Sequence, residues 1–335
     1  MKCPKCGSET NPSASLCGRC GALMRPSSNS SWLSSTDVVR DWRWDETNTT
    51  DHLNKSDEVM HDSDNKAPIG QKYAIVIGTT YKGTSIGTLP ATKYDVQYMK
   101  KVLVESFGFP KSNVTVIAED AVTKANVENA LHSLNESGLR ASDQVLVYFS
   151  GHGGRVDTNT GDGRTHGYLI THDARSGGSF ARTCVSMRAI WEPLEQCRAN
   201  QRLLICDACH SGHLADNKSL SAPSLLDHEF LSLIDGPKRM SPRAAVQVIT
   251  AGRRDEVVAA HVDDTRLSPF THLLLTRMGD LALHGQQFTA KSLGEWLQAN
   301  YPEFVRENNG YYVSEPLIEN VCGSRGNFVF TPART

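Results

Sequence analysis

Two short segments decide the fold: Ser-Gly-His-Gly at Ser150–Gly153 and Asp-Ala-Cys-His-Ser-Gly at Asp207–Gly212. Each follows an apolar run that predicts a buried strand, QVLVYFS at Gln144–Ser150 and QRLLIC at Gln201–Cys206. Small residues and glycines then break each pattern, where a loop can leave the end of a sheet. Open α/β sheets place their sites at the carboxyl ends of strands. We therefore expect one His and one Cys to be delivered to that edge.

His152 and Cys209 have the residue types of a catalytic base and a nucleophile. A reduced Cys with a His elsewhere in the chain is a candidate catalytic pair. The thiolate attacks, while the imidazole holds the proton and then donates it to the leaving amine. The pair predicts a cysteine peptidase. His210 and His213 lie one and four positions from Cys209 and are alternative bases, but we interpret them as loop or surface residues.

From Lys72 onward, short apolar runs alternate with helical patterns. Continuous apolar strands between amphipathic helices predict an α/β protein with a mainly parallel sheet and helices on both faces. The pattern predicts strands at Tyr73–Ile77, Val114–Ile117, Val145–Phe149, Tyr168–Ile170, Leu203–Cys206 and Val246–Thr250, and helices at Asp95–Ser106, Thr123–Asn135, Pro269–Leu283 and Ser292–Asn300.

The overall composition narrows the class of protein. A chain of 335 residues can form one large domain with its own core, plus appendages. Its formal net charge of −2 argues against general binding of polyanions. No apolar run is long enough to span a bilayer, and the N-terminus lacks the apolar segment of a signal peptide. Nine cysteines, four of them in a metal-like spacing, fit a reducing cytosol, so we expect a cytoplasmic protein without membrane contact.

Residues 1–24 hold two C-x-x-C pairs, CPKC and CGRC, each followed by glycine. Two such knuckles present four thiolates tetrahedrally to a zinc ion. So short a segment cannot form a core of its own, and metal binding would supply its folding energy. A redox-active C-x-x-C would need a βαβ context that is absent here. We therefore expect a zinc ribbon with structural Zn²⁺ held by Cys3, Cys6, Cys17 and Cys20.

Residues 25–69 are rich in Ser, Asn, Asp and Thr and predict a flexible linker. Trp32, Trp42 and Trp44 are unusual in such a segment. They either pack locally or onto the main domain, or they form a docking segment that binds a regulatory protein or covers the active-site groove. Residues 70–335 then form the third unit, the peptidase domain.

Around the two motifs the chain resembles the caspase-like cysteine peptidases, and more closely their metacaspase branch. The caspase signature is Gln-Ala-Cys followed by Arg, Gln or Gly and then Gly, with a His about 50 residues upstream. Here Cys209 stands in DACHSG, and His152 precedes it by 57 residues. Metacaspases share a YFSGHG and a DACHSG much like these. The resemblance covers roughly residues 70–332, with further similar segments at Tyr73–Gly78, Tyr94–Asp95, Val248–Gly252, Phe270–Leu275 and Phe328–Thr331.

The resemblance implies roles for residues around the dyad. It places the oxyanion hole at the backbone N–H groups of Gly153 and Cys209, where a glycine lets the loop approach the substrate carbonyl. It also places Asp95, Ser150 and Asp207 together at the floor of S1, the pocket for the residue before the cleaved bond. Two carboxylates there would favour a guanidinium or ammonium group, so we expect cleavage of proteins after Arg, then Lys.

Two residues bear on this prediction of an acidic S1 pocket. Asp95 has the alternative role of N-cap of its helix. At Thr92 the metacaspase pattern more often has Cys, a departure that should not reverse the charge preference.

The segment at residues 213–245 corresponds to the intersubunit linker of caspase-like folds, and cleavage there is expected to activate the enzyme. Metacaspases often need Ca²⁺, which takes six to eight oxygen ligands. Asp157, Asp162 and Asp173 follow the catalytic His but do not form the dense acidic run of that site, so Ca²⁺ dependence stays open. The candidate self-cleavage points are Lys218, Lys238, Arg239 and Arg243.

Several alternatives remain open. The chain can be a catalytically latent adaptor that acts through its ribbon and linker, although neither His152 nor Cys209 is lost. Clostripain-like and legumain-like peptidases use a similar order of His and Cys and are the alternative family. A nucleic-acid binder ranks last, because residues 1–24 contain few cations and no aromatic residue for base stacking.

Overall fold

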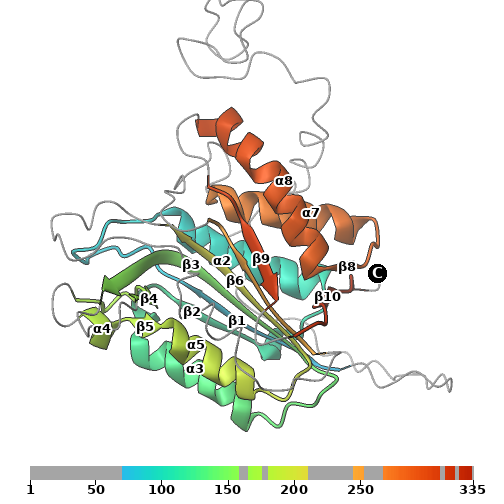
Figure 1. The fold of residues 1–335 in the computed structure, drawn as a ribbon, viewed down its shortest axis with the longest axis horizontal. Helices are drawn as coiled ribbons and strands as arrows, with labels where there is room; N and C mark the ends of the chain where they lie inside the picture. The colour runs from blue at the N-terminus through green and yellow to red at the C-terminus, as the bar shows by residue number, and fades with distance from the viewer. Residues whose placement is uncertain are drawn as a thin grey trace, which may run out of the picture. The chain divides into compact units, whose positions relative to one another are not determined.

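The computed structural model describes residues 70–157, 165–175, 180–209, 244–252, 267–309, 314–320 and 324–333. Within these residues a central sheet has the strand order β2-β1-β3-β6-β7-β9 (Figure 1), while β4 pairs with β3, and β5 pairs with β4. A separate pair is formed by β8 and β10. The strands are β1 (Lys72–Gly78), β2 (Val114–Ala118), β3 (Gln144–Asp157), β4 (Thr165–Leu169), β5 (Val185–Ser186), β6 (Gln201–Cys209), β7 (Ala245–Thr250), β8 (Phe288–Thr289), β9 (Leu317–Asn320) and β10 (Val329–Phe330).

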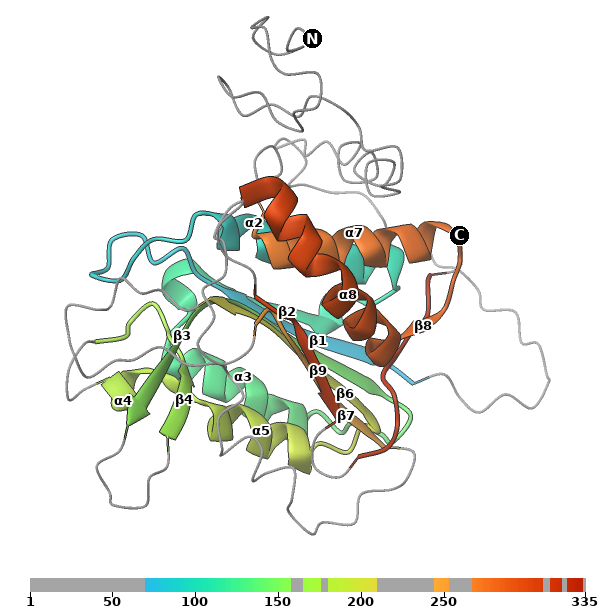
Figure 2. The same ribbon diagram turned by 45° about the horizontal axis from the view of Figure 1, so that its top comes forward.

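Helices cover both faces of this sheet. The views in Figures 1 and 2 agree that α3 and α5 lie on one face and that α2, α7 and α8 lie on the other. The helices are α2 (Ala91–Lys101), α3 (Lys124–Glu136), α4 (Phe180–Thr183), α5 (Met187–Gln196), α7 (Pro269–Leu283) and α8 (Ala290–Asn309), with a π-helical turn at Val102–Ser106 and 3₁₀ turns at Lys111–Asn113 and Glu119–Ala121.

The five strands from β2 to β7 pair in parallel, and β9 closes one edge antiparallel to β7. Parallel strands are buried on both faces, which explains why their sequences are continuous apolar runs. The expected α/β architecture, a mainly parallel sheet with helices on both faces, is therefore confirmed for the described part of the chain.

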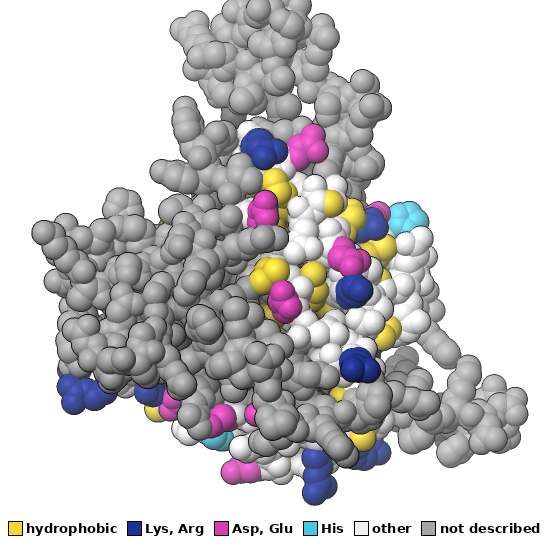
Figure 3. All heavy atoms as spheres, viewed as in Figure 1, with side chains coloured by type: hydrophobic (Ala, Val, Ile, Leu, Met, Phe, Trp, Pro, Cys, Tyr) yellow, Lys and Arg dark blue, Asp and Glu magenta, His cyan; other side chains and the backbone are white. Residues whose placement is uncertain are grey.

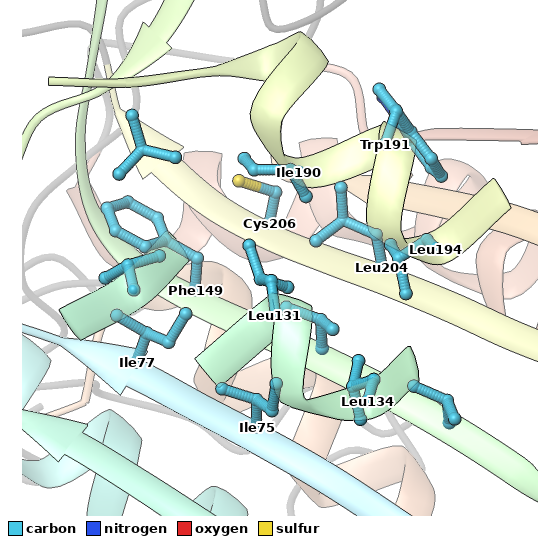
Figure 4. Packing of buried hydrophobic residues seen from close by; sticks show 14 of the residues in the cluster. Ile75, Ile77, Leu131, Leu134, Phe149, Ile190, Trp191, Leu194, Leu204 and Cys206 are labelled. Atoms are coloured by element: carbon cyan, nitrogen blue, oxygen red, sulfur yellow. The ribbon is translucent and has the colours of Figure 1, made fainter. Parts of the chain in front are cut away.

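The main apolar core lies between the sheet and the α3–α5 layer (Figure 4). Ile75 and Ile77 of β1, and Phe149 of β3, pack there with Leu131 of α3 and Ile190 of α5. Each such side chain contributes about 1.5–3 kcal/mol when it is fully buried. Alternate residues of a strand point to opposite faces. Because Phe149 faces α3 and α5, its neighbours Tyr148 and Ser150 face α2 and α7.

Strand β3 is longer than the sequence predicts. The glycines after Ser150 were expected to open a loop, but β3 continues to Asp157 because β4 pairs with it antiparallel, from Gly153–Leu169 to Asp157–Thr165. Strand β6 likewise continues to Cys209 beside β3. Ser150–Gly153 therefore lies within β3, and Asp207–Cys209, the described part of the second motif, lies within β6, so the expectation that loops begin at Gly151 and after Cys206 was wrong.

Helix starts show one further difference. Thr123 caps α3 as expected, with its hydroxyl accepting the N–H of Asn126. Helix α2 begins at Ala91, four residues before the expected start, so Asp95 lies inside the helix. The alternative role of Asp95 as an N-cap is therefore wrong.

The described surface carries mixed charges. Figure 3 shows Lys and Arg side chains interspersed with Asp and Glu side chains over the coloured part of one face. One such pair is Lys291 and Glu295 of α8, whose Nζ and Oε1 atoms are 3.8 Å apart. Among the described helices, none combines the length and the apolar character needed to cross a bilayer.

Candidate active site

The parallel register brings the two motifs side by side. In the pairing of β3 with β6, Ser150 lies opposite Asp207, and His152 lies opposite Cys209. Gly78 at the end of β1 lies opposite Ser150 on the other side of β3. The carboxyl ends of three adjacent strands therefore meet at one edge, and the backbones of the two predicted catalytic residues are register partners there.

The imidazole of His152 is held by a backbone carbonyl. His152 is buried, and its Nε2 lies 2.7 Å from the oxygen of Gly87, in the segment between β1 and α2. A carbonyl oxygen can only accept, so Nε2 donates the proton of this hydrogen bond. In that tautomer the lone pair belongs to Nδ1, the nitrogen that can take a proton from a thiol. No acid for this orienting role is apparent from the sequence, and in the structure a main-chain oxygen contacts the imidazole.

Tyr81 positions the backbone of His152. Its hydroxyl accepts the N–H of His152 at 2.8 Å and donates to the carbonyl of Ile170 at 2.8 Å. The two rings are also close, with centroids 4.8 Å apart. Tyr81 has φ 58°, a left-handed conformation that is uncommon for a bulky residue. Nothing in the sequence pattern pointed to Tyr81, because a single tyrosine after a strand gives no sign of a contact with a residue so far along the chain.

The three residues expected in S1 lie together. Asp95 comes from α2, Ser150 from β3 and Asp207 from β6, and all three side chains are buried. Ser150 donates its hydroxyl to Oδ2 of Asp95 at 2.8 Å. The register places Ser150 beside Asp207. Two carboxyl groups and a hydroxyl thus converge on the α2–α7 face of the sheet.

Two residues of α7 join this cluster and were not found from the sequence. Ser268 is the N-cap of α7, and its N–H donates to Oδ1 of Asp95 at 2.9 Å while its hydroxyl donates to Oδ2 of Asp207. Thr271 donates its hydroxyl to the same Asp207 oxygen at 2.6 Å. Ser and Thr at a helix start normally signal only capping, so nothing in the local pattern pointed to contacts with acids from α2 and β6.

Burial changes the protonation of these acids. The pKa of Asp95 is raised well above its usual value, first because burial disfavours the charged form and second because the charge of Asp207 is close. Burial also raises the pKa of Asp207, against the opposing effect of the Ser268 and Thr271 hydrogen bonds. Both groups thus resist carrying a negative charge while no cation is near.

A small pocket opens onto this cluster. Oδ1 of Asp207 is buried and has no hydrogen-bond partner, although the rest of the carboxylate is well bonded. Thr92, the position that departs from the metacaspase pattern, also lies at the pocket. The lining residues are Leu89, Ala91, Thr92, Ser150, Gly151, Asp207 and Ser268.

Two other expected site residues, Gly153 and Asp173, are among the described residues. Gly153 is described, and a Cβ there would meet the Cβ of Ala208 at 3.5 Å, an ordinary contact. The carboxylate of Asp173 lies 3.4 Å from the N–H of Lys124 at the start of α3. Among the described residues, no group of three or more His, Cys, Asp or Glu side chains is placed to hold a metal ion.

The remaining expectations lie outside the described residues. These are the ribbon with its four cysteines, the linker with its three tryptophans, Asp162, and the four candidate self-cleavage points Lys218, Lys238, Arg239 and Arg243.

Comparison with known proteins agrees with this geometry. A family model described as Caspase domain matches residues 71–294. Metacaspase-3 of Arabidopsis thaliana is 31% identical over 159 residues, which cover 45% of this chain and 42% of that protein. Metacaspase-1A of Aspergillus oryzae is 30% identical over 156 residues, covering 44% and 36%. The matches thus span less than half of the length of these relatives.

Solved structures show the same fold. Caspase-1 from Spodoptera frugiperda is similar to this chain with a TM-score of 0.50 at 16% identity, over 83% of this chain and 99% of that one. At this identity the likeness concerns the fold alone.

Proposed function

The chain belongs to the family of proteins with a caspase domain and is related to the metacaspases, and we propose that it is a cysteine endopeptidase that cleaves proteins after Arg and, less well, after Lys. The observation that carries this proposal is the pocket lined by Ser150 and Asp207. Within the described residues, Oδ1 of Asp207 is buried without a hydrogen-bond partner, and Asp95 lies in the same hydrogen-bonded cluster.

In the proposed mechanism His152 and Cys209 act as base and nucleophile. Nδ1 of His152 takes the thiol proton of Cys209, and the thiolate attacks the carbonyl carbon of the scissile bond. The N–H groups of Gly153 and Cys209 stabilise the negative oxygen that forms. The protonated imidazole then donates its proton to the leaving amine, which leaves a thioester. Water, deprotonated by His152, hydrolyses the thioester and releases the second product.

Charge in the pocket supports the substrate preference. A guanidinium group of the substrate would meet Oδ1 of Asp207, and charged hydrogen bonds of this kind are stronger than neutral ones. An acidic side chain would instead be buried against two carboxyl groups, and juxtaposed like charges cost several kcal/mol. With about 1.4 kcal/mol for each factor of ten, we expect Arg to be preferred over Asp by more than about 100-fold.

Matched fluorogenic peptides ending in Arg, Lys or Asp test the proposal. Full-length wild type and Cys209→Ala are compared, with and without millimolar Ca²⁺, which also tests the open question of calcium dependence. Cleavage after Arg that vanishes in the variant supports both the nucleophile and the acidic pocket. Cleavage after Asp contradicts the pocket assignment and leaves the dyad in place. No cleavage of any peptide contradicts the peptidase proposal for the intact chain and favours a latent adaptor.

We further propose that the enzyme matures by cutting itself in the segment at residues 213–245. Basic residues in that segment match the substrate preference proposed above. Replacing Lys218, Lys238, Arg239 and Arg243 together by Gln should then keep the purified chain intact while wild type breaks into two fragments, as seen by mass spectrometry. Fragmentation of Cys209→Ala at the same sites would instead identify a contaminating peptidase.

A further inference from the structure

The hydrogen bonds around the two acids of the pocket have fixed directions. Asp95 accepts at both oxygens, from the N–H of Ser268 at Oδ1 and from the hydroxyl of Ser150 at Oδ2. The hydroxyl of Ser268 accepts the N–H of Thr271 at 3.3 Å and gives its own proton to Asp207. Each hydroxyl has one proton, so its donor role is thereby used.

The contact between Tyr148 and Thr271, farther from the pocket, also has a fixed direction. The hydroxyl of Thr271 donates to Oδ2 of Asp207, so the Tyr148 hydroxyl, 2.6 Å from Thr271 Oγ1, must be the donor in that contact. Three of the carboxylate oxygens of Asp95 and Asp207 therefore already accept hydrogen bonds. The fourth, Oδ1 of Asp207, is buried and receives no hydrogen bond from the described residues, and Asp207 lines the pocket.

Within the part of the chain that the structure describes, none of the residues that line the pocket is basic, so no counter-charge lies there for this pair of acids. The titratable groups that face the pair are the other acid, the Tyr148 phenol on β3 and the Cys206 thiol on β6, while α7 contributes the neutral hydroxyls of Ser268 and Thr271. When two carboxyl groups are buried together, ionising both of them costs free energy, because their negative charges repel each other. Burial and mutual repulsion accordingly raise the pKa of Asp95.

From this geometry we propose that Asp95 and Asp207 together hold one proton while the pocket is empty, and that the cationic side chain of a substrate takes the place of that proton. The inference rests on the proposed function, because it concerns the same pocket. On binding, the guanidinium or ammonium group contacts Oδ1 of Asp207, both carboxylates become ionised, and the proton leaves to solvent. The net charge of the pocket is the same before and after, because one proton is exchanged for one substrate cation and a single negative charge remains in both states.

This exchange gives the pocket a pH-dependent selectivity. As pH falls, protons compete with the substrate cation, so the affinity for an Arg side chain falls relative to that for a neutral side chain of the same shape. Citrulline is such a side chain, because it replaces the guanidinium by an uncharged urea. The exchange therefore predicts a proton released by an Arg peptide and none released by the matched citrulline peptide.

Calorimetry on the full chain carrying Cys209→Ala tests this without turnover. An acetylated tetrapeptide ending in arginine amide, and its citrulline counterpart, are titrated between pH 5 and pH 8 in pairs of buffers whose ionisation enthalpies differ, acetate and MES at the acidic end and phosphate and Tris at the basic end. The difference in heat should report about one proton released per arginine peptide at the acidic end of the range. The release should decline toward pH 8 as the pair ionises by itself, and the citrulline peptide should release none.

The outcomes separate this inference from the proposed function. Arginine-selective binding with no proton release anywhere from pH 5 to pH 8 overturns the exchange and leaves the substrate preference intact. Equal binding of the two peptides, or no binding of the arginine peptide, overturns both. Asp95→Asn in the same background removes one acid, so the release should fall well below that of the parent. An unchanged release would show that Asp207 titrates alone and would overturn the shared proton.

Discussion

At the scale of single residues, the backbone and the imidazole of His152 are each held by a hydrogen bond, to the hydroxyl of Tyr81 and to the carbonyl of Gly87. Tyr81 bonds to the main chain of His152 and of Ile170, and Ile170 in turn donates its N–H to the carbonyl of His152. The hydroxyl of Tyr81 thus joins His152, inside β3, to Ile170, the residue that follows β4. Its left-handed backbone is the kind of local strain that proteins maintain where a side chain must be aimed.

Tyr81→Phe should slow catalysis more than it weakens substrate binding. The ring remains, but the buried N–H of His152 and the carbonyl of Ile170 lose their partner. Leaving such groups unsatisfied costs about 1–3 kcal/mol. We expect kcat to fall about tenfold, with KM within about twofold, because about 1.4 kcal/mol in the barrier is a factor of ten.

Peptide hydrolysis and urea unfolding measure both quantities. Tyr73→Phe is the control, since Tyr73 is a partly buried residue of β1 that packs against the main core. A Tyr81→Phe enzyme with unchanged kcat would exclude the positioning role.

At the scale of elements, the end of α5 is joined to β6 by one buried cation. The guanidinium Nη1 of Arg202 donates to the carbonyls of Leu194, Glu195 and Cys197 at 2.9, 3.1 and 3.2 Å. These are the carbonyls that a helix leaves without partners at its C-terminus, where a positive charge also complements the helix dipole. Arg202 therefore caps α5 from the neighbouring strand.

Arg202→Met should destabilise the fold by about 2–4 kcal/mol, because three buried carbonyls lose a charged donor. Arg202→Lys should recover part of the loss, since an ammonium keeps the charge without the planar fork of donors. Arg198→Met, at an exposed site in the connection after α5, is the matched control and should change little. The free energy of unfolding in urea measures all three. Equal stability of wild type and Arg202→Met would contradict the capping role.

The sequence predicted the strands of the parallel sheet well, because the burial that shapes these strands also makes their sequences apolar. Parallel strands are apolar on both faces, so β1, β3, β6 and β7 appeared as apolar runs at nearly the observed positions. The extension of β3 beyond Ser150 was missed because it depends on pairing with β4, and glycines inside a strand resemble a loop. The side chains of Ser268, Thr271 and Tyr81 were missed for a related reason, since their contacts join residues far apart in the chain.

At the scale of the whole molecule, one buried histidine links stability to pH. His272 of α7 is stacked on Phe304 of α8, with ring centroids 5.4 Å apart. Burial lowers the pKa of His272 to about 4, whereas an unfolded histidine titrates near pH 6.5. The unfolded chain thus binds this proton first, so the contribution of His272 to stability is complete above about pH 6.5 and is lost as pH falls toward 4. Asp95 and Asp207, with raised pKa values, act in the opposite sense.

His272→Phe should remove this pH dependence while it keeps the stacked ring. Between pH 7 and pH 4 the difference in unfolding free energy between variant and wild type should shift in favour of the variant by up to about 3 kcal/mol. Urea titrations at a series of pH values measure it. His132→Gln, at an exposed site on α3, serves as the control and should follow the wild-type curve. A His272→Phe curve parallel to that of wild type would contradict the assignment.

The zinc ribbon at residues 1–24 lies outside the described residues and stays a prediction, which is tested on the full-length chain. We expect about one zinc ion per chain by elemental analysis, lost on Cys3→Ser with Cys17→Ser. We also expect the peptidase domain, residues 70–335, to keep its unfolding midpoint after the loss, because its apolar core is built from residues far along the chain from the ribbon. Full zinc content in the double variant would refute the ribbon, and a large fall in the midpoint would refute its independence.

The bond from His152 to the carbonyl of Gly87 has a consequence for how this site can vary. Every amino acid carries a main-chain oxygen, and a methyl group at position 87 would still lie 3.9 Å from the imidazole. A side chain can therefore be introduced at position 87 while the hydrogen bond persists. An alanine scan would not detect the contribution of this main-chain oxygen, because the substitution does not remove it. Replacing the peptide bond after Gly87 by an ester, which makes the carbonyl a poorer acceptor, is the chemical change that would reveal it.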